Sequence, residues 1–517
     1  MAKSGSKSSC KIISLDLYNK IRLSRKGGIH KERKSMDEEK ITFPEPDAVL
    51  MEKPSIKKYI KYISFFGPGA IVASATIGQG QLILGPQIGA WAGYKLLWLI
   101  TLSVASYIVA YVSCRFMLLS GINMTDIFAI KTKKGFLNWI FIAIIFIFVP
   151  LFAAAIVTTL GQSLAWIAGE GHYLLWGISF CLLAAILAVA GRYKLVEYTQ
   201  AFFVAVLGIG AIASLFIIKP DILKMLPNFF LVGNVPAYPA WVNEQFPSVA
   251  QKPVSLIMLG YIGTLTFTIV TLVGYSGWVK VKRWGIFKGK KNADEFSQNL
   301  FNKFKEEGKI NYLPDDSHEI KKSRILLKPM LIDISIAFVI VAIVSSAYMI
   351  AGEHYLGPQD GSYKLPTDIN LLKEQAIIFS DIAPWLKPLY QISVFFALFG
   401  TVYAGFEAAS RMVYETSKNV VSRIMNIPYK KFMLYFLIYI LVTGIPLAII
   451  GSMTSIILML SITLLFIGVI GVIIYGIGAI YMSQKFLPEK YKLGNIALAV
   501  TIMAVILLIV PMFFLFI

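Results

Sequence analysis

The sequence predicts an all-helical membrane protein with about eleven spans, arranged as two inverted repeats of five helices and one additional helix. Of its 517 residues, 57% are hydrophobic and only 15% are charged, which is typical of polytopic membrane proteins. Apolar runs of about 20 residues or more, enough to cross a bilayer, recur from residue 62 to the C-terminus. Two of these runs, five spans apart, carry glycine-rich interruptions, a pattern that indicates an inverted repeat with a binding site between its halves.

The apolar runs separate a polar N-terminal tail from a transmembrane transporter domain at residues 59–517. Residues 1–58 are rich in lysine and arginine, and we expect a basic, partly disordered cytoplasmic tail. The first repeat would cover residues 62–218 and the second residues 254–482, with an extra helix at 494–517. The expected spans are residues 62–90, 93–118, 137–167, 173–190, 195–218, 254–278, 329–351, 386–410, 432–450, 454–482 and 494–517.

Loop charge predicts the orientation of these spans. Lysines and arginines are frequent in the segments after the even-numbered spans and sparse, or balanced by acids, in the others. Because cytoplasmic loops carry the excess of positive charge, we expect a multi-pass protein of the cell membrane with a cytoplasmic N-terminus and an extracellular C-terminus. Residues 279–328 would form a cytoplasmic loop and residues 219–253 an extracellular cap. The net charge of +20 then reflects orientation and attraction to the lipid bilayer, and no nucleic-acid partner is expected.

The long cytoplasmic loop contains a stripe of apolar residues with helical spacing. The polar residues between them place all the apolar side chains on one face. We expect a short helix that lies on the membrane surface. The stripe consists of Phe296, Leu300, Phe301 and Phe304.

The first span is interrupted at Gly78-Gln79-Gly80-Gln81. Glycine in a helix costs about 1 kcal/mol relative to alanine, so this alternation of glycine and glutamine favours a break. Backbone groups freed inside a membrane must be satisfied by protein or by a water-filled cavity, and transporters use such breaks to hold a substrate or ion. The alternative is that both amides only cap the freed backbone. The expected substrate-binding residues are Thr76, Ile77, Gly78, Gln79 and Gln81.

The sixth span has a comparable interruption, which we expect near Gly263 to Thr266. Glycines alternate there with threonines, and Tyr261, Thr264 and Thr266 are the expected substrate-binding residues of this span. Threonines in membrane helices also bond to carbonyls of their own helix or pack at helix contacts. We interpret Thr268 and Thr271 in that second way.

Glu407 in the eighth span is the most centrally placed carboxylate of the membrane region. An acid inside a membrane is a functional candidate by default, so Glu407 is the expected residue for ion or proton coupling. Arg411 lies four residues further on and can pair with Glu407 on one helix face. Asp333 follows Lys328 closely and is interpreted as an interfacial anchor.

The sequence argues against an enzyme and against a cofactor. The three cysteines have no paired spacing, and the four histidines lie in polar segments outside the apolar runs. No nucleophile motif and no pair of carboxylates is present in the spans. A disulfide framework, a zinc site and a catalytic site are therefore not expected.

In several of its motifs the chain resembles the natural resistance-associated macrophage protein (NRAMP) family of proton-coupled divalent-metal transporters, which have the leucine-transporter-like fold. Gly67-Pro68-Gly69 stands where the family has Gly-Pro-Gly, and Gln87 and Gly89-Ala90 match further along the first span. Weaker likenesses occur at Thr125-Asp126, at Gly191-Arg192-Tyr193-Lys194 and at Phe396-Ala397-Leu398-Phe399-Gly400. Together they extend over most of the membrane region, and they imply a metal transporter.

The metal ligands of the family do not carry over to this chain. Its Asp-Pro-Gly-Asn motif is replaced by Gly78-Gln79-Gly80-Gln81, and its Met-Pro-His motif falls at Thr264-Leu265-Thr266. The metal site that the resemblance implies would therefore consist of Gln81, Thr264 and the carbonyl of Tyr261. Neutral oxygen ligands favour hard cations such as Mg²⁺ or Mn²⁺ over soft metals, and stripping a dication of water with neutral ligands alone is costly.

These observations predict a secondary transporter that moves a hard or hydrated divalent cation by alternating access. The alternative is a transporter of a small organic solute or amino acid, possibly coupled to sodium; a channel and an inactive relative also remain open. The span-1 aspartate, the span-6 histidine and the span-3 acids of the family are absent. Glutamine and threonine do not titrate in the physiological range, so proton coupling is expected to be absent or to depend on Glu407 alone.

Overall fold

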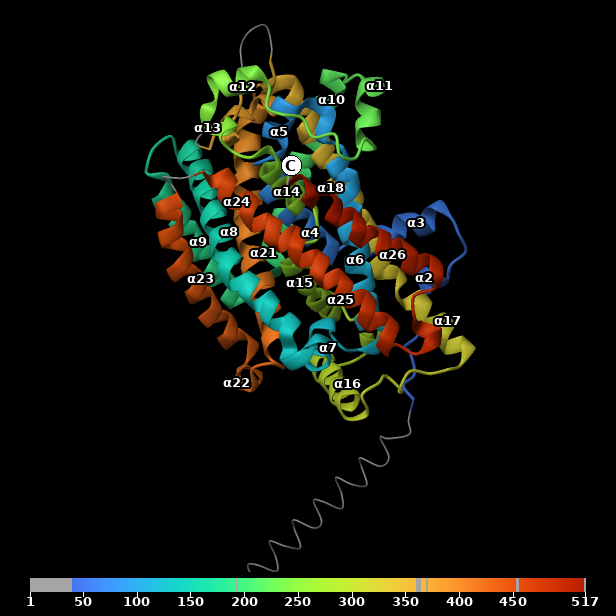
Figure 1. Ribbon diagram of the computed structural model, residues 1–517. Helices are drawn as coiled ribbons and strands as arrows, with labels where there is room; N and C mark the ends of the chain where they lie inside the picture. Colours follow the sequence, from blue (N-terminus) through green and yellow to red (C-terminus); the bar gives the residue numbers. More distant parts are fainter. Residues whose placement is uncertain (1–39, 192, 359–363, 369–370, 452–454, 516–517) are drawn as a thin grey trace, which may run out of the picture.

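The computed structural model describes residues 40–191, 193–358, 364–368, 371–451 and 455–515. Every regular element in these ranges is helical. The helices form one bundle, with short helices gathered at each of its two ends (Figure 1). The expected all-helical fold is therefore present, and the N-terminal part of the predicted tail, residues 1–39, lies outside the described residues.

The membrane helices follow the order that the hydropathy predicts. Nine helices of the described chain are long and apolar enough to cross a membrane, and α10 with its bent continuation makes ten. The first predicted span is not among them because its break divides it into two shorter helices. The spans are α4 (Pro68–Thr76) with α5 (Gly85–Ala92), α6 (Trp98–Ser120), α8 (Phe136–Ala168), α9 (Tyr173–Ala190), α10 (Tyr193–Ile218), α14 (Val254–Leu265) with α15 (Ile269–Val281), α18 (Lys328–Leu356), α21 (Leu386–Ser417), α23 (Tyr429–Gly451), α24 (Ile456–Leu464) with α25 (Gly471–Phe486), and α26 (Asn495–Ile509).

Spans 1 and 6 both depart from regular α-helix: Gly78 to Gln81 in span 1 stay helical but within a π-helical turn, whereas span 6 contains non-helical residues, and these two interruptions are called the breaks. Between α4 and α5 the chain forms the π-helical turn η2 (Ile77–Gln81) and a further turn over residues 82–84. Between α14 and α15, residues 266–268 are non-helical, two residues later than expected, because the helix continues through Gly263 to Leu265. A third interruption, which the sequence analysis did not predict, is the π-helical segment η7 (Leu465–Ile470) between α24 and α25.

The broken helices lie in the middle of the bundle. Helices α4 and α5 pack against α18, and α14 packs against α24 and η7. Helix α8 contacts α9, α21, α23 and α24, while α21 also contacts α10 and α15. Large side chains that are fully buried, such as Tyr261, Phe267 and Tyr275, fill the space around the breaks.

One end of the bundle carries the short helices of the predicted cap, α11 (Ile222–Met225), α12 (Ala240–Gln245) and α13 (Pro247–Ala250) (Figure 1). The end of the chain reaches the same region, because the ring of Phe514 contacts Trp98 and is the nearest neighbour of Gly233 in the cap segment. Cap and C-terminal segment therefore share one end of the molecule.

The opposite end carries α7 (Met124–Lys131), α16 (Ala293–Glu307) and α17 (Ser317–Leu326). Helix α16 contains the predicted apolar stripe, but the expectation that it lies on the membrane is wrong. Leu300 and Phe304 are buried against the bundle, with Leu300 beside Gly121 and the ring of Phe304 edge-on to Phe486. The stripe therefore packs on protein.

Residues 40–47 of the predicted tail also contact this end of the bundle. Phe43 is buried, and its N–H donates to Glu319 Oε2 at 2.6 Å. The N–H of Ile41 donates to the carbonyl of Tyr312 at 2.9 Å. These contacts join the N-terminal segment to the long loop between α15 and α18.

Candidate functional site

The two broken helices meet at residues that the sequence analysis selected. Tyr261 Oη on α14 donates a hydrogen bond to Gln81 Oε1 at 2.9 Å. Gly80 lies directly against Thr264, so that a Cβ at position 80 would overlap the threonine side chain. Gln81, Tyr261 and Thr264 are all fully buried. The breaks of spans 1 and 6 are thus in contact, and glycine at position 80 is what allows the close approach.

The break in the first span also lies against α21. A Cβ at Gly78 would overlap the Thr401 hydroxyl and come within 2.8 Å of the Ala397 carbonyl. Thr76 and Ile77, on either side of the junction between α4 and η2, are buried as well. The backbone of Gln79 belongs to the π-helical turn, whereas its side chain lies outside what the structure describes.

The threonine hydroxyls of span 6 donate to backbone carbonyls. Thr264 Oγ1 donates to the carbonyl of Tyr261 at 2.7 Å. Thr266 Oγ1 donates to the carbonyl of Gly468 in η7 at 2.7 Å and to Gly263 at 3.0 Å. Thr266 therefore links the sixth span to the tenth and does not point toward Gln81. In this conformation both hydroxyls therefore bond to backbone carbonyls, as the alternative interpretation of these threonines expects.

Gln81 leaves one polar atom without a partner. Its Nε2 is buried, and no hydrogen-bond partner lies within reach among the described residues. A buried amide group of this kind normally has a partner, because leaving it unpaired costs about 1–3 kcal/mol. A ligand or a water molecule at the break would supply the missing contact.

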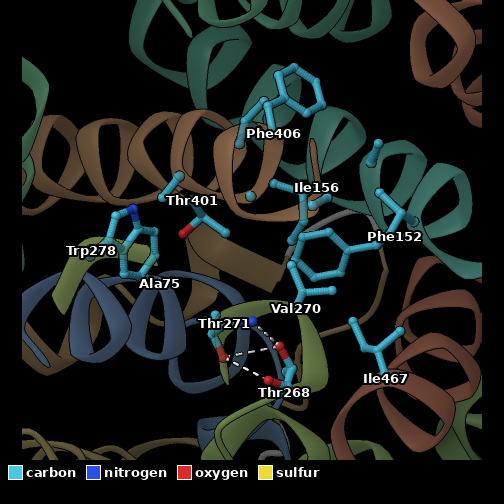
Figure 2. Close-up of a pocket in the computed structure, with 16 residues that line it drawn as sticks. Ala75, Phe152, Ile156, Thr268, Val270, Thr271, Trp278, Thr401, Phe406 and Ile467 are labelled. Carbon is cyan, nitrogen blue, oxygen red and sulfur yellow. Dashed lines mark hydrogen bonds between the residues drawn. The ribbon is translucent and has the colours of Figure 1, made fainter. Parts of the chain in front are cut away.

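A small cavity lies beside these breaks, between α4, α8, α15, α21 and η7 (Figure 2). Its volume is about 40 Å³, which is room for a few water molecules. Three hydroxyl-bearing residues, Thr268, Thr271 and Thr401, contribute to a lining that is otherwise apolar. Figure 2 shows Thr268 and Thr271 on one side of the cavity and Thr401 with Ile156 across from them. Thr268 also caps α15 by accepting from the N–H of Thr271 at 3.1 Å. Two threonines that the sequence analysis assigned to helix packing therefore border the cavity.

The cavity contains no carboxylate, imidazole or thiol. Across the described residues, no group of three or more His, Cys, Asp or Glu side chains could hold a metal ion. The donors near the breaks are thus the neutral oxygens that the sequence analysis expected at Gln81, Tyr261 and Thr264, together with the hydroxyls of the cavity. These groups can bind a cation through their dipoles, but they provide no negative charge to neutralise it.

Glu407 is held by three neighbours at the end of the cavity region where Trp278 lies. The ion pair expected with Arg411 is present, with Oε1 accepting from Nη2 at 2.7 Å and from Nε at 2.9 Å. Trp278, which lines the cavity, donates its Nε1–H to Oε2 at 2.9 Å. The Tyr429 hydroxyl lies 3.3 Å from the Glu407 carbonyl oxygen. Glu407 is therefore linked to the cavity through Trp278 and fixed by Arg411.

A second charged cluster, which sequence reasoning missed, lies beyond Glu407 and lines a polar cavity of about 770 Å³. Lys418 Nζ contacts Glu415 at 2.5 Å and Asp126 at 3.6 Å. Asn123 Nδ2 donates to Glu415 at 2.7 Å, and Asn419 Nδ2 donates to Asp126 at 2.6 Å. Burial raises the pKa of Asp126, and the nearby positive charge of Lys418 opposes this shift. The available signal was the clustering of polar residues at the ends of two apolar runs.

The structure contradicts the interpretation of Asp333 as an interfacial anchor. Its side chain is fully buried between α18, α4 and α15. Tyr275 Oη donates to its Oδ2 at 2.8 Å, and backbone N–H groups at the start of α4 complete its contacts. The sequence placed Asp333 near a helix end but gave no indication that the start of α4 would lie against it.

A further charged contact closes the opposite end of the bundle, near the cap. Asp368, in the segment between α18 and α21, accepts from Lys252 Nζ at 2.8 Å. Its second oxygen accepts from Ser455 Oγ at 3.1 Å and from the N–H of Ile457 at 3.0 Å, at the start of α24. This contact joins the segments that precede α14 and α24.

Two solved structures of one manganese transporter share the architecture of this chain. The crystal structure of the manganese transporter of Eremococcus coleocola, in complex with an aromatic bis-isothiourea substituted compound, matches with a TM-score of 0.63 and 15% identity over 89% of this chain and 88% of that chain. A mutant of the same transporter gives a TM-score of 0.62 and 16% identity over the same shares. At this level of identity the likeness establishes the fold.

Comparison of sequences gives a second, independent result. No curated protein matches the chain. The family model described as natural resistance-associated macrophage protein-like, however, matches residues 69–517, which include every membrane helix from α4 onward. The chain therefore belongs to the natural resistance-associated macrophage protein-like (Nramp) family.

Proposed function

We propose that this protein is a secondary transporter that moves a hard or hydrated divalent cation, such as Mg²⁺ or Mn²⁺, across the cell membrane by alternating access. The observation that supports the proposal most directly is the contact between the two broken helices, where Gln81, Tyr261 and Thr264 bring neutral oxygens together. Family membership supports a metal substrate, and oxygen donors without sulfur favour the hard members of that class.

Hydration decides which dication this site can accept. Mg²⁺ loses its water reluctantly and is usually bound with several waters in place. Hydroxyls of Thr268, Thr271 and Thr401 would then contact the water shell of the ion. The cavity is too small for a hydrated ion in the present conformation, so the α4 and α15 segments would have to separate during transport.

Flux into proteoliposomes tests this proposal. Purified protein would be reconstituted and offered Mg²⁺, Mn²⁺, Ca²⁺, Fe²⁺ and Cd²⁺ in turn, with Gln81→Leu as the site variant and Gly494→Ala as the control, since nothing lies near a Cβ at position 494. We expect uptake of Mg²⁺ or Mn²⁺ that exceeds uptake of Cd²⁺ and that Gln81→Leu reduces at least tenfold. Uptake dominated by Cd²⁺, or no divalent flux at all, contradicts the proposal.

The alternative substrate is a small organic solute or amino acid, possibly with sodium. One observation favours it: the cavity next to the breaks is almost entirely apolar and holds no charged side chain. The two functions are distinguished in the same vesicles by offering a mixture of labelled amino acids with and without a sodium gradient. Sodium-dependent uptake of an amino acid without divalent flux would establish the alternative.

The orientation belongs to the same proposal. The cap segment and the C-terminal helix would face outward, and the N-terminal segment with α16 would face the cytoplasm, as the loop charge predicts. Thiol labelling of Lys305→Cys on α16, from one side of intact cells, tests this placement. Labelling by an impermeant reagent applied outside would contradict it.

A further inference from the structure

Helix α3 (Ile56–Tyr62) and the following turn η1 (Ile63–Phe65) present an unusual apolar face. Ile56 is 81% exposed, Ile60 62% and Ile63 63%, and Tyr59 between them is also exposed. Their spacing of three and four residues places these side chains on one side of the helix. A stripe of this kind on a protein surface marks an interaction site.

The orientation of this stripe is fixed from the other side of the helix. Lys58 is buried, and its ammonium group donates to the backbone carbonyls of Glu52 and Leu50. Ser55 caps the helix by accepting from the N–H of Lys58 at 3.1 Å. The helix is therefore held by its polar side, and its isoleucines point away from the protein.

Positive charge borders the apolar stripe. Lys53 and Lys57 are exposed, and neither has an ion-pair partner among the described residues, whereas Lys61 is paired with Glu52 at 2.6 Å. Helix α18, which contacts η1, begins at the exposed Lys328. The surface around the stripe thus combines apolar side chains with uncompensated cations.

The position in the chain identifies what covers this surface. The turn η1 ends at Phe65, and α4, the first membrane helix, begins at Pro68. A helix attached so closely to a membrane helix lies at the level of the lipid headgroups. An apolar face with lysines along its border is the pattern of helices that lie in that layer, and lysines near the surface attract anionic lipids.

We propose that α3 is an interfacial helix that inserts Ile56, Ile60 and Ile63 into the bilayer surface and that Lys53 and Lys57 bind anionic phospholipid headgroups. The occupant of the face is the lipid bilayer itself. This surface is separate from the contact between the broken helices, so the inference does not depend on which substrate is transported.

Insertion is tested with an environment-sensitive fluorophore on Ile60→Cys, in full-length protein carrying Cys10→Ser and reconstituted in nanodiscs. The two other cysteines, Cys114 and Cys181, are buried. Lys305→Cys on the polar face of α16 is the matched control. We expect spin-labelled lipids to quench the probe at position 60 at least twofold and to leave the control unchanged. A probe at position 60 that emits as in water and is not quenched overturns the proposal and leaves the face to a protein partner.

The lysine contribution is tested separately, with the double variant Lys53→Gln/Lys57→Gln. Binding of phosphatidylglycerol to the purified protein would be measured against phosphatidylcholine, at low salt, by native mass spectrometry. We expect the variant to bind the anionic lipid about thirtyfold more weakly than the wild type, and Lys305→Gln/Lys309→Gln to bind it unchanged. Equal binding by the wild type and the α3 variant would show that these lysines do not recognise the headgroups.

Discussion

Asp333 on α18 accepts hydrogen bonds from the backbone N–H groups of Gly67, at 2.8 Å to Oδ1, and Gly69, at 2.7 Å to Oδ2. These are donors at the start of α4 that have no partner inside the helix. A carboxylate at this end of a helix is also favoured by the helix dipole. The start of the first membrane helix is therefore fastened to the seventh span by a buried acid.

Asp333→Asn should loosen this contact. The amide can still accept one hydrogen bond, but it loses the charge and turns an N–H group toward a donor. We therefore expect the free-energy difference that favours the state with α4 attached over the state with α4 detached to fall by about 2 kcal/mol. The measurement is thiol labelling of Ala75→Cys, which lines the small cavity, in a Cys10→Ser background. Labelling should become at least tenfold faster in Asp333→Asn.

The control for this experiment is Asp294→Asn. Asp294 is exposed and pairs with Lys280 at 2.9 Å at the same end of the molecule, so its removal changes the charge without releasing α4. If both variants leave the labelling rate of Ala75→Cys unchanged, Asp333 does not hold the closed position of α4.

How far the sequence predicted the fold follows from the kind of signal each element carries. Apolar runs located the spans, and glycine-rich interruptions located the breaks of spans 1 and 6 to within two residues. The π-helical segment η7 escaped prediction because Leu465 to Ile470 is uniformly apolar apart from Gly468. The packing of α16 on protein was missed because an amphipathic stripe shows that a face is covered, and a lipid surface and a protein surface leave the same pattern.

The ion pair between Lys252 and Asp368 predicts a closure near the cap. Lys252 is almost completely buried and Asp368 is partly exposed, so Asp368→Asn should weaken the closed state by about 2 kcal/mol, between the values for exposed and buried pairs. Modification of Ala90→Cys on α5 by an impermeant thiol reagent should then become about thirtyfold faster. The control variant Lys224→Gln, on the exposed cap helix α11, should leave this modification rate unchanged. An unchanged rate in Asp368→Asn would place the closure elsewhere.

Gly80→Ala tests the contact between the two broken helices. The new Cβ would overlap Thr264, so α4 and α14 must separate, and we expect substrate flux to fall at least tenfold while the protein remains folded. Thr264→Gly in the same chain removes the overlapping side chain and should restore part of the flux. Restoration would show that the defect is steric, and a variant that stays inactive would point to a role of the Thr264 hydroxyl itself.

Part of the contact between the two breaks could be predicted from residue types, whereas the role of these residues stays a prediction. Residue types at the interruptions selected Gln81, Tyr261 and Thr264, which the structure brings together. Orientation was not predictable: Thr266 bonds to Gly468 in another span. Asp333 and the cluster around Lys418 depend on contacts between residues far apart in the chain, which local patterns do not encode.

The last prediction concerns proton coupling. Proton co-transport needs a titratable group that can change its charge during the cycle, and the residues at the broken helices are neutral. Glu407 is linked to the cavity through Trp278, but Arg411 donates two hydrogen bonds to its Oε1, at 2.7 and 2.9 Å, and this ion pair would have to break before the carboxylate could exchange a proton. We therefore expect substrate uptake without acidification of liposomes that contain a pH dye.

Glu407→Gln separates the two remaining possibilities in the same measurement. If uptake of the wild type does acidify the liposomes, the substitution should abolish acidification, because Glu407 is the carboxylate that contacts Trp278 beside the cavity. Arg411→Gln is the matched variant: it removes the ion-pair partner of Glu407, so acidification should appear or increase in this variant and should be lost again in Glu407→Gln/Arg411→Gln. Acidification that persists in Glu407→Gln would reveal a proton path through other groups, and Asp333 would be the next residue to substitute, since its carboxylate lies between α4 and α15.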